Sequence, residues 1–446
     1  MFNKQYKPRS NCFGVFYFGP MIQKIYEHYL EVRCVSTDTR HIPQGAIFFA
    51  LKGERFNGNT FAAQALEVGA SMVVIDQADC LTDPRMVLVE DVLVALQEVA
   101  RLYRMSWHIP VIGITGSNGK TTTKELMRDV LMKRYKVHAT KGNLNNHIGV
   151  PLTILSMPSD TTLAIIEMGA NHQKEIEGYC KYALPTHGLI TNIGKAHLEG
   201  FGGEEGVFKG KRELFVAVHA TGGVLFVNPE LPRLAEASQG METVDYGFQS
   251  GGMQLQVLRE DPTLVYSSEK NGAITEVTTQ LAGAYNLYNI ATAIAVGRFF
   301  EVPEADIHAA IAAYQPENNR SQWHKTAQNE LILDAYNANP SSMEHALRAF
   351  ANQNHSNKIF ILGDIRELGE ASEEEHRHIF ELAQALGLTG IWVGEWFQRL
   401  ALEHGQMGFN DTAAAKEYLQ AEAWVGKLIL IKGSRGIQLE HLVPFL

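Results

Sequence analysis

Residues 113–125 read GITGSNGKTTTKE, a composition typical of a loop that holds phosphate. The glycines allow a tight turn, so that backbone N–H groups and the start of a following helix can surround an anion. Lys120 would then neutralise the β and γ phosphates of a nucleotide, and the hydroxyl of Thr121 would face Mg²⁺. The common pattern G-x-x-x-x-G-K-[ST] has glycine where this chain has Ile114, so the match is imperfect. The alternative is a glycine-rich turn between a strand and a helix, with a solvated lysine.

The elements around this loop decide where other reactive groups can stand. An apolar run at 109–112 precedes the loop and a helix-like segment at 125–135 follows it, which predicts strand, loop and helix. In an open parallel sheet, ligands bind at the carboxyl ends of the strands. Four polar residues follow predicted strands in this way: Glu167, His197, Asp334 and Asp364. A carboxylate and a neutral imidazole beside a phosphate loop could hold a metal ion, although each residue alone could also be an ordinary surface group.

A lysine-rich segment, FKGKRELF at 208–215, follows His197 along the chain. Its cationic side chains, Lys209, Lys211 and Arg212, could form the solvated face of a helix or reach an anionic site. Spacing alone leaves both interpretations open.

The composition limits the classes of protein. The 446 residues suffice for about three domains, and 45% of them are apolar and can fill the cores. The net charge is −10, from 39 basic and 49 acidic residues without a basic run, so we expect no nucleic-acid partner. The four cysteines are widely spaced, which favours a reducing, cytoplasmic setting over a disulfide framework or a zinc site. No apolar stretch reaches the roughly 18 to 20 residues that a membrane span requires.

The first twenty residues place Lys4, Lys7 and Arg9 before a short apolar patch, which faintly resembles a secretory signal. The alternative, which we prefer, is a disordered leader before a folded chain that begins near Met21.

The order of the predicted elements indicates an α/β protein of three domains. Residues 1–105 predict a small mixed α/β unit, and a linker is expected at 103–110. Residues 106–315 predict a parallel sheet around the phosphate loop, with antiparallel strands added between about 223 and 280. Residues 316–446 predict four strands separated by helices, which is a second parallel α/β domain.

Taken together, these segments resemble the Mur ligase family over nearly all of residues 25–446. The loop TGSNGKTTTKE is similar to the family's ATP loop, which explains the missing glycine at position 114. Further motifs carry the resemblance: KGNLNNHIGVPLTIL, EMGANHQKEI, NIGKAHLEGFG, DAYNANPSSM, GDIRELGE and IKGSR. The resemblance implies a central P-loop ATPase domain with a parallel sheet. A small mixed α/β N-terminal domain and a Rossmann-like C-terminal domain would flank it.

The resemblance also implies an activity, which is ATP-dependent amide formation through an acyl phosphate. The motifs are most similar to those of a member that adds D-alanyl-D-alanine to UDP-N-acetylmuramoyl-tripeptide in peptidoglycan precursor synthesis. ATP and Mg²⁺ would be the cofactors, and the enzyme would be a cytoplasmic monomer. Two alternatives stay open: a folylpolyglutamate synthase, which shares the phosphate loop, and a P-loop switch or motor ATPase, which would need no carboxylate acceptor.

Carried over position by position, the resemblance implies roles for particular residues. The catalytic set would be Lys120, Glu167, His197 and Lys211, and the metal ligands would be Thr121, Glu167, His197 and Lys211. Lys211 resembles the family lysine that takes up CO₂ as a carbamate. Carbamylation would turn a cation into an anion that is able to approach Mg²⁺. Lys209 is a near neighbour and is the alternative residue for this role.

Substrate contacts are implied in the same way. The ATP-binding residues would be Thr115, Gly116, Ser117, Asn118, Gly119, Lys120, Thr121, Thr122, Asn286, Asn289, Arg320 and Asp334. The UDP-substrate would meet Ser36, Thr37, Asp38, Thr39, Arg40, Asn57, Gly58, Asn145 and Asn146. The dipeptide would meet Tyr336, Asn337 and Asn339. The chain departs from the family pattern where Tyr285 replaces a histidine and where Asn57 and Asn59 replace aspartate and histidine.

Overall fold

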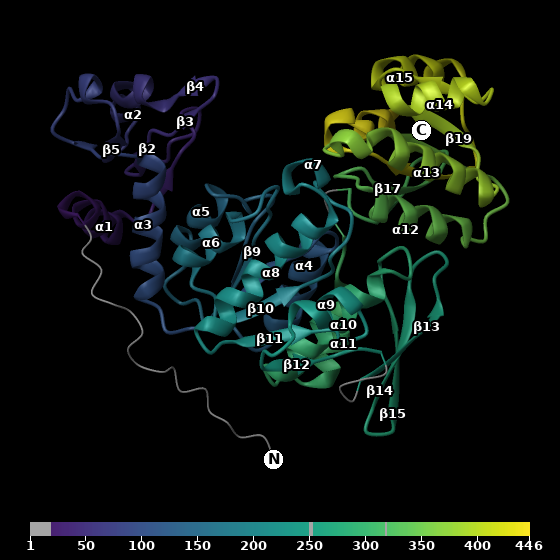
Figure 1. Ribbon diagram of the computed structural model, residues 1–446, viewed down its shortest axis with the longest axis horizontal. Coiled ribbons are helices and arrows are strands. Elements are labelled where there is room, and N and C mark those ends of the chain that lie inside the picture. Colours follow the sequence, from purple (N-terminus) through teal and green to yellow (C-terminus); the bar gives the residue numbers. More distant parts are fainter. Residues whose placement is uncertain (1–18, 249–252, 317–318) are drawn as a thin grey trace.

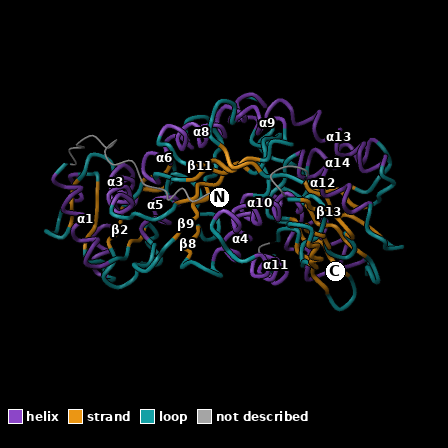
Figure 2. Tube along the Cα trace, turned by 90° about the horizontal axis from the view of Figure 1, so that it is seen from below, coloured by secondary structure: helices purple, strands orange, loops and turns teal. Residues whose placement is uncertain are grey.

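The computed structural model describes residues 19–248, 253–316 and 319–446. The predicted leader over 1–20 lies almost wholly outside these residues, and the first described helix, α1, begins at Pro20. The chain forms three α/β domains in a row, with the phosphate-loop domain in the middle (Figure 1; Figure 2). The predicted domain limits fall between the three main sheets and stay predictions.

The first domain is built on a four-stranded sheet in the order β1-β2-β5-β6, in which all strands are parallel. The strands are β1 (Val35–Ser36), β2 (Ile47–Phe49), β5 (Met72–Ile75) and β6 (Met86–Leu88), with a small hairpin of β3 (Lys52–Gly53) and β4 (Phe56–Asn57). The helices are α1 (Pro20–Val32), α2 (Ala62–Glu67) and α3 (Val92–Met105), with short 3₁₀ turns at Gly58–Phe61 and Ala78–Cys80. All four residues of β5 are buried, as expected for a parallel strand covered on both faces.

The linker predicted at 103–110 is wrong in its first half, because helix α3 continues through it. The hydroxyl of Tyr103 donates to the carbonyl of Met157 at 3.0 Å, and Arg104 donates to the carbonyl of Ala183 at 3.1 Å. Both acceptors belong to the middle domain. These long polar side chains fasten the end of α3 to that domain, so the helix does not end where the sequence turns polar.

The middle domain contains a six-stranded parallel sheet in the order β12-β11-β10-β7-β9-β8. The strands are β7 (Val111–Thr115), β8 (Val137–Ala139), β9 (Leu163–Glu167), β10 (His187–Ile190), β11 (Val224–Val227) and β12 (Thr243–Asp245). The helices are α4 (Lys120–Leu131), α5 (Gly149–Leu155), α6 (Glu175–Ala183), α7 (Leu198–Phe201), α8 (Glu204–Ala220), α9 (Pro232–Ala237), α10 (Asn286–Phe299) and α11 (Glu304–Ala313). The strand order reverses at β7, and a crevice for ligands forms at such a switch point.

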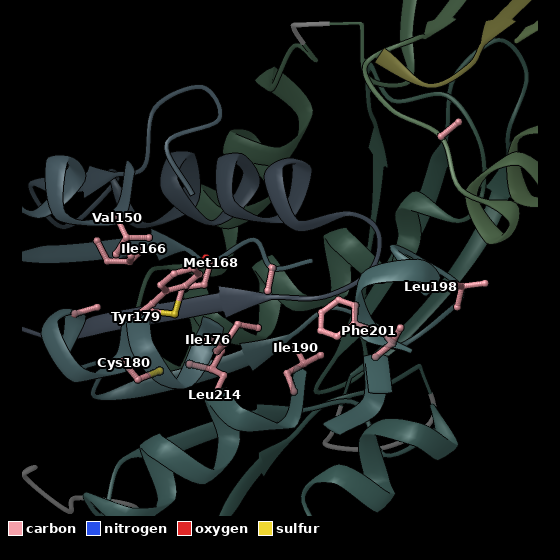
Figure 3. Close-up of a cluster of buried hydrophobic side chains, with 14 of the residues drawn as sticks. Val150, Ile166, Met168, Ile176, Tyr179, Cys180, Ile190, Leu198, Phe201 and Leu214 are labelled. Carbon is pink, nitrogen blue, oxygen red and sulfur yellow. The ribbon is translucent and has the colours of Figure 1, made fainter. Parts of the chain in front are cut away.

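Two hydrophobic cores hold the helices on this sheet. Figure 3 shows part of one core, in which Ile166 of β9, Tyr179 of α6, Ile190 of β10, Phe201 of α7 and Leu214 of α8 are labelled. The other core joins α4, α10 and α11. Helix α10 is apolar on all sides and almost fully buried, which is the pattern of a helix inside a core. This packing brings the start of α10 beside the phosphate loop.

A three-stranded antiparallel sheet extends the middle domain, with strands β13 (Gln254–Arg259), β14 (Val265–Lys270) and β15 (Ala273–Thr278). The antiparallel strands expected between about 223 and 280 are therefore present only from β13 onward. Before them, β11 and β12 extend the parallel sheet instead. The physical reason is that β11 is a continuous apolar run with a buried interior, which suits a parallel strand.

The third domain has a six-stranded sheet in the order β16-β17-β21-β18-β19-β20, parallel except for β16 at one edge. The strands are β16 (Gln322–Lys325), β17 (Glu330–Asp334), β18 (Lys358–Gly363), β19 (Gly390–Val393), β20 (Gly408–Phe409) and β21 (Leu428–Lys432). The helices are α12 (Pro340–Ala351), α13 (Ser372–Ala385), α14 (Glu395–Glu403) and α15 (Thr412–Ala421), with 3₁₀ turns at Gly369–Ala371, Arg435–Ile437 and Leu439–Phe445. The four expected strands are present. The two edge strands were missed, because β16 is polar and β20 has only two residues.

Within the described ranges, no helix is both long enough and apolar enough to cross a membrane.

Candidate active site

The phosphate loop lies between β7 and α4, at the switch point of the central sheet. Ile114 is fully buried inside β7, so position 114 belongs to the strand and the turn begins at Gly116. Gly116 has φ of +147°, and a β-carbon there would stand 1.9 Å from the hydroxyl of Thr191. The glycine is required by this close approach, whereas the glycine missing at 114 is not needed for the turn.

A second loop, residues 191–197 between β10 and α7, holds the phosphate loop in shape. The side-chain oxygen of Asn192 accepts from the backbone N–H of Asn118 at 3.0 Å, and its amide donates to the carbonyl of Asn118 at 3.0 Å. The hydroxyl of Thr191 donates to the same carbonyl at 2.6 Å, and the hydroxyl of Ser117 donates to the carbonyl of Gly194 at 3.0 Å. Asn192 was not among the predicted site residues, although it is the first residue of the motif NIGKAHLEGFG and follows a strand.

Lys120 begins α4, and its ammonium donates to the carbonyl of Gly116 at 2.6 Å. Burial lowers the pKa of Lys120 to about 8, against the opposing attraction of Glu167, and the charge of Arg320 adds to the lowering. Arg320 belongs to the third domain, so that domain already contributes to the field around the phosphate loop. An anionic phosphate would favour the ammonium form.

Glu167 ends β9 and is 1% exposed. The hydroxyl of Thr121 donates to its two oxygens at 3.1 and 3.0 Å, and the amide of Asn145 donates to one of them at 2.9 Å. The ammonium of Lys124, itself 2% exposed, lies 3.4 Å from the other oxygen. Burial alone would raise the pKa of Glu167, but Lys124, Lys120 and Asn145 hold it below its usual range. Lys124 was missed, and its signal was its position one turn after Thr121 on the same helix.

The hydroxyl of Thr121 and the carboxylate of Glu167 are hard oxygen donors that fit Mg²⁺. Over the ranges the structure describes, no group of three or more His, Cys, Asp or Glu residues is placed to hold a metal ion.

Lys211 lies on α8 with its side chain fully buried. Its ammonium is 3.4 Å from the carbonyl of Ala170, three residues after Glu167, and 5.1 Å from the ring of Phe201. Burial lowers its pKa well below the usual value, and the charge of Lys120 adds to this. Uptake of CO₂ requires the neutral form of the amine, and the lowered pKa of Lys211 favours that form. Lys209, by contrast, is exposed.

His197 lies at the end of the 191–197 loop, where it precedes α7 with φ of +52°. The hydrogen-bond partner of its ring is the carboxylate of Glu367, from the loop after β18 in the third domain. The hydrogen bond from His197 lowers the pKa of Glu367. The sequence could not indicate Glu367 as the partner, because 170 positions separate the two residues.

Asn286 and Asn289, expected on the adenine side, brace the phosphate loop from α10. The side-chain oxygen of Asn289 accepts from the hydroxyl of Thr123 at 3.0 Å, and its amide donates to Asn286 at 2.8 Å. A β-carbon at Gly119 would come within 2.5 Å of Asn289. Tyr285, in the place of the family histidine, shares a 2.7 Å hydrogen bond with Ser321 of the third domain.

The third domain presents Arg320 and Tyr336 together. The guanidinium of Arg320 lies 3.6 Å from the centre of the Tyr336 ring, and that of Arg435 lies 5.1 Å from it. Asp334, at the end of β17, accepts from the backbone N–H of Ser321 at 3.1 Å and pairs with the buried Lys432. Two arginines therefore lie close to the ring of Tyr336.

The two asparagines after β17 have different surroundings. Asn337 is exposed, whereas Asn339 caps α12 and donates from its amide to the side chain of Asn118 at 2.7 Å. The nucleotide loop and the third domain are thus in direct contact.

A cavity of about 800 Å³ lies in the third domain and was not foreseen. Its lining comes from the loops after β18, β19, β20 and β21 and from Glu199 of the middle domain, and it includes Asp364, Arg366, Glu367 and Trp396. Tyr336, Asn337 and Asn339 are not among the lining residues. Glu367 lines the cavity and also contacts His197, so one lining residue links the cavity to that histidine.

The residues expected to meet a UDP-substrate are divided between two domains. In the first domain, the hydroxyl of Ser36 donates to the carbonyl of His41 at 3.0 Å, and Asp38 forms an ion pair of 2.8 Å with Arg40. That pair lowers the pKa of Asp38 to about 2. Thr37 and Thr39 stand on the same turn and are partly exposed.

The other residues expected to meet the UDP-substrate are held more tightly by their neighbours. Gly58 leaves no room for a side chain, since a β-carbon there would stand 2.6 Å from the carbonyl of Leu51. The side chain of Asn57 accepts from the N–H of Asn59 at 3.1 Å. In the middle domain, Asn146 accepts from the N–H of Gly149, the first residue of α5, at 2.8 Å, while Asn145 donates to Glu167 at 2.9 Å.

Comparison with known proteins gives matches to three family models and to named relatives. The family model described as Mur ligase middle domain matches residues 114–297, that described as Mur ligase, glutamate ligase domain matches 319–435, and that described as Mur ligase family, catalytic domain matches 31–104. A Bacillus subtilis protein named UDP-N-acetylmuramoyl-tripeptide--D-alanyl-D-alanine ligase is 34% identical over 424 residues, which cover 92% of each chain.

Solved structures agree with these matches. A crystal structure of MurF from Acinetobacter baumannii has a TM-score of 0.84 at 30% identity and covers 95% of this chain and 97% of that one. The crystal structure of MurF ligase from Thermotoga maritima in complex with ADP has a TM-score of 0.81 at 24% identity, covering 96% and 98%.

Proposed function

Because this chain belongs to the Mur ligase family, we propose that it is the ATP-dependent ligase that joins D-alanyl-D-alanine to UDP-N-acetylmuramoyl-tripeptide. The observation that carries the proposal is that residues of the third domain contact the phosphate loop and contribute charge to it. Asn339 bonds to the loop, and the charge of Arg320 reaches Lys120 and Glu167. A site divided in this way suits transfer from ATP to a second substrate. The cytoplasm, where ATP and the nucleotide-linked precursor would be found, is the proposed location.

In the first step, an oxygen of the terminal carboxylate of the tripeptide attacks the γ phosphorus of ATP. The new P–O bond gives an acyl phosphate, and the bond to ADP breaks. Two anions meet in this step, so cationic groups must offset their repulsion. Lys120 is the group for this, supported by Arg320. The backbone N–H groups from Gly119 to Thr121, at the start of α4, are the proposed contacts of the nucleotide phosphates, because those of Ser117 and Asn118 already donate to Asn192.

In the second step, the amine of the dipeptide attacks the acyl carbon. An acidic side chain of the cavity first takes one proton from the dipeptide ammonium, so that the neutral amine is the nucleophile. The C–N bond forms, phosphate leaves with the C–O electron pair, and the second proton lost by the nitrogen passes to the departing phosphate. The cavity in the third domain is the proposed seat of the dipeptide, because its lining includes Glu367, the partner of His197, and carries both signs of charge. Arg366 would meet the dipeptide carboxylate, and the acidic side chains would meet its ammonium. Tyr336, Asn337 and Asn339, which are predicted to meet the dipeptide, do not line this cavity, and their contact with the dipeptide stays a prediction.

Thr121 and Glu167 are the proposed ligands of Mg²⁺, which when bound supplies positive charge to the phosphate oxygens. A carbamate on Lys211 would add an anionic group to the same side of the site, whereas the unmodified ammonium would repel a cation. His197 is the proposed ligand of a second ion, with Glu367 orienting its ring. A histidine ligand is commonly oriented in this way by a carboxylate.

The first domain is proposed to hold the uridine diphosphate, with the turn from Ser36 to Arg40 and the loop at Asn57 and Gly58 as the contacts. A folylpolyglutamate synthase, the alternative within the same chemistry, would not use this domain for such a ligand. The match of residues 31–104 to a Mur ligase description favours the cell-wall substrate.

A phosphate-release assay tests the proposal. With ATP, Mg²⁺ and UDP-N-acetylmuramoyl-tripeptide present, phosphate should appear only when D-alanyl-D-alanine is added. Glutamate should not replace the dipeptide, because a pocket for a dipeptide leaves buried polar groups unpaired, at about 1 to 3 kcal/mol for each lost hydrogen bond. Phosphate release with glutamate and a folate, or without any acceptor, would overturn the proposal.

A further inference from the structure

The 191–197 loop contacts the phosphate loop on one side and the third domain on the other. Toward the phosphate loop, Thr191 and Asn192 bond to Asn118, and Gly194 bonds to Ser117. These contacts fix the backbone that would surround the nucleotide phosphates. Any displacement of the 191–197 loop therefore changes the shape of the phosphate loop.

Toward the third domain, Lys195 is the centre of the contacts. Its backbone N–H donates to the hydroxyl of Ser341 on α12 at 3.3 Å, and its ammonium lies 2.6 Å from the carboxylate of Glu375 on α13. The nearest carboxylate of its own domain, Glu204, is 3.9 Å away. The hydrogen bond with Glu375 raises the pKa of Lys195.

The two members of this pair differ in burial. The side chain of Glu375 is 6% exposed and that of Lys195 is 40% exposed. If the third domain moved away, Lys195 would keep Glu204 and water, but Glu375 would lose the ammonium that compensates its charge. While the domains are docked, a carboxylate buried in this way is costly without a partner charge, and Lys195 supplies that charge, so the ion pair supports the docked arrangement.

We propose that Lys195 and Glu375 are positioning residues that couple docking of the third domain to the shape of the phosphate loop. Docking fixes Lys195, Lys195 fixes the 191–197 loop, and that loop fixes Ser117 and Asn118. The γ phosphate is then held for transfer only when the domain that carries the dipeptide is in place, which protects ATP and the acyl phosphate from water. The inference rests on the proposed function.

The test compares Lys195→Met, Glu375→Gln and the double variant in the intact enzyme. Each is assayed for the phosphate released per amide bond formed, with Glu381→Gln, an exposed residue on the same helix, as the matched control. Each single variant should raise this ratio about threefold, the effect expected of a partly exposed ion pair. The double variant should resemble the single variants, because residues that act as a pair are not additive.

A second readout follows the loop itself. With ADP bound, backbone amides 116–119 and 191–197 should exchange hydrogen faster in both single variants than in the wild type, by more than the amides of the central strands β7 and β9 do. A loss of overall stability would lower the melting temperature, but it would not by itself raise the phosphate released per amide bond formed.

Unchanged ratios in both single variants, additive effects in the double variant, or an equal effect of Glu381→Gln would overturn the inference. Phosphate release by the wild-type enzyme distinguishes failure of the proposed function from failure of this inference. If the wild type shows no release that depends on the dipeptide, the proposed function fails; if it does and the variants match it, only the coupling role of Lys195 and Glu375 fails.

Discussion

The side chains of Asn118 and Asn339 join two domains through one hydrogen bond, in which the amide of Asn339 donates to the side-chain oxygen of Asn118 at 2.7 Å. Asn118 belongs to the phosphate loop, and Asn339 is the N-terminal cap of α12. The side-chain oxygen of Asn339 accepts from the N–H of Ser342 at 2.9 Å, so one residue both caps a helix and contacts the nucleotide loop.

The two roles of Asn339 can be separated. Asn339→Asp keeps an oxygen for the cap but removes the donor to Asn118, whereas Asn339→Ala removes both. We expect the Asp variant to melt at the wild-type temperature and to ligate about fivefold more slowly, the value of one neutral hydrogen bond of about 1 kcal/mol. The Ala variant should also lose about 1 kcal/mol of unfolding free energy. Equal melting of all three proteins would contradict the role of Asn339 as a cap.

Lys120→Ala should nearly abolish ligation while the fold is kept. Its ammonium is the group nearest the phosphates in the proposed site, and single electrostatic contributors of this kind supply about 10²-fold or more in rate. Steady-state kinetics and circular dichroism would measure the two effects. Lys133→Ala, an exposed lysine just beyond α4, is the matched control. If the Lys120 variant kept more than about a tenth of the wild-type kcat, Lys120 would not have this role.

Lys211→Ala should lose activity if a carbamate on Lys211 serves the site, and a small carboxylate such as formate should restore part of it. The added anion would fill the place of the missing carbamate in the cavity left by the side chain. Lys209→Ala should behave like the wild type, because Lys209 is exposed. Mass spectrometry of the intact enzyme in bicarbonate, or a crystal structure with metal bound, would detect the modification. An unmodified ammonium in the metal-bound enzyme would exclude it.

Glu304 should stabilise the fold at neutral pH but not at low pH. Burial alone would raise its pKa, but hydrogen bonds with His308, Arg298 and Lys270 hold the pKa well below the usual value of 4.5. A lowered folded-state pKa gives stability that is present above the unfolded value and is lost as the pH falls toward the folded value. Glu304→Gln should therefore cost about 1 kcal/mol at pH 7, allowing for solvent screening, and the difference should shrink below about pH 4.5. Urea unfolding at pH 7 and pH 3.5 would measure it, and a constant difference would contradict this origin.

The sequence by itself determined the local parts of the site. The strand, the glycine turn and the start of α4 are encoded within about twenty consecutive residues, and so are the places of Glu167 and Asp334 at the ends of apolar strands. Parallel strands bring such ends to one edge of a sheet, which is why Thr121 and Glu167 were expected together and are hydrogen-bonded. The three-domain fold followed from the alternation of strands and helices and from the motifs.

Only the tertiary structure decided which residues meet across the domains. His197 with Glu367, Lys195 with Glu375 and Asn118 with Asn339 are each separated by 170 positions or more, and periodicity carries no information over such distances. The burial of Lys124 and Lys211, which lowers the pKa of Lys211, depends on helices packed from other parts of the chain. The cavity around Asp364 arises where four loops of one sheet meet Glu199 of another domain. Charge, burial and the shape of a cavity depend on every group within reach in space, and the chain sets that neighbourhood only when its domains are packed together.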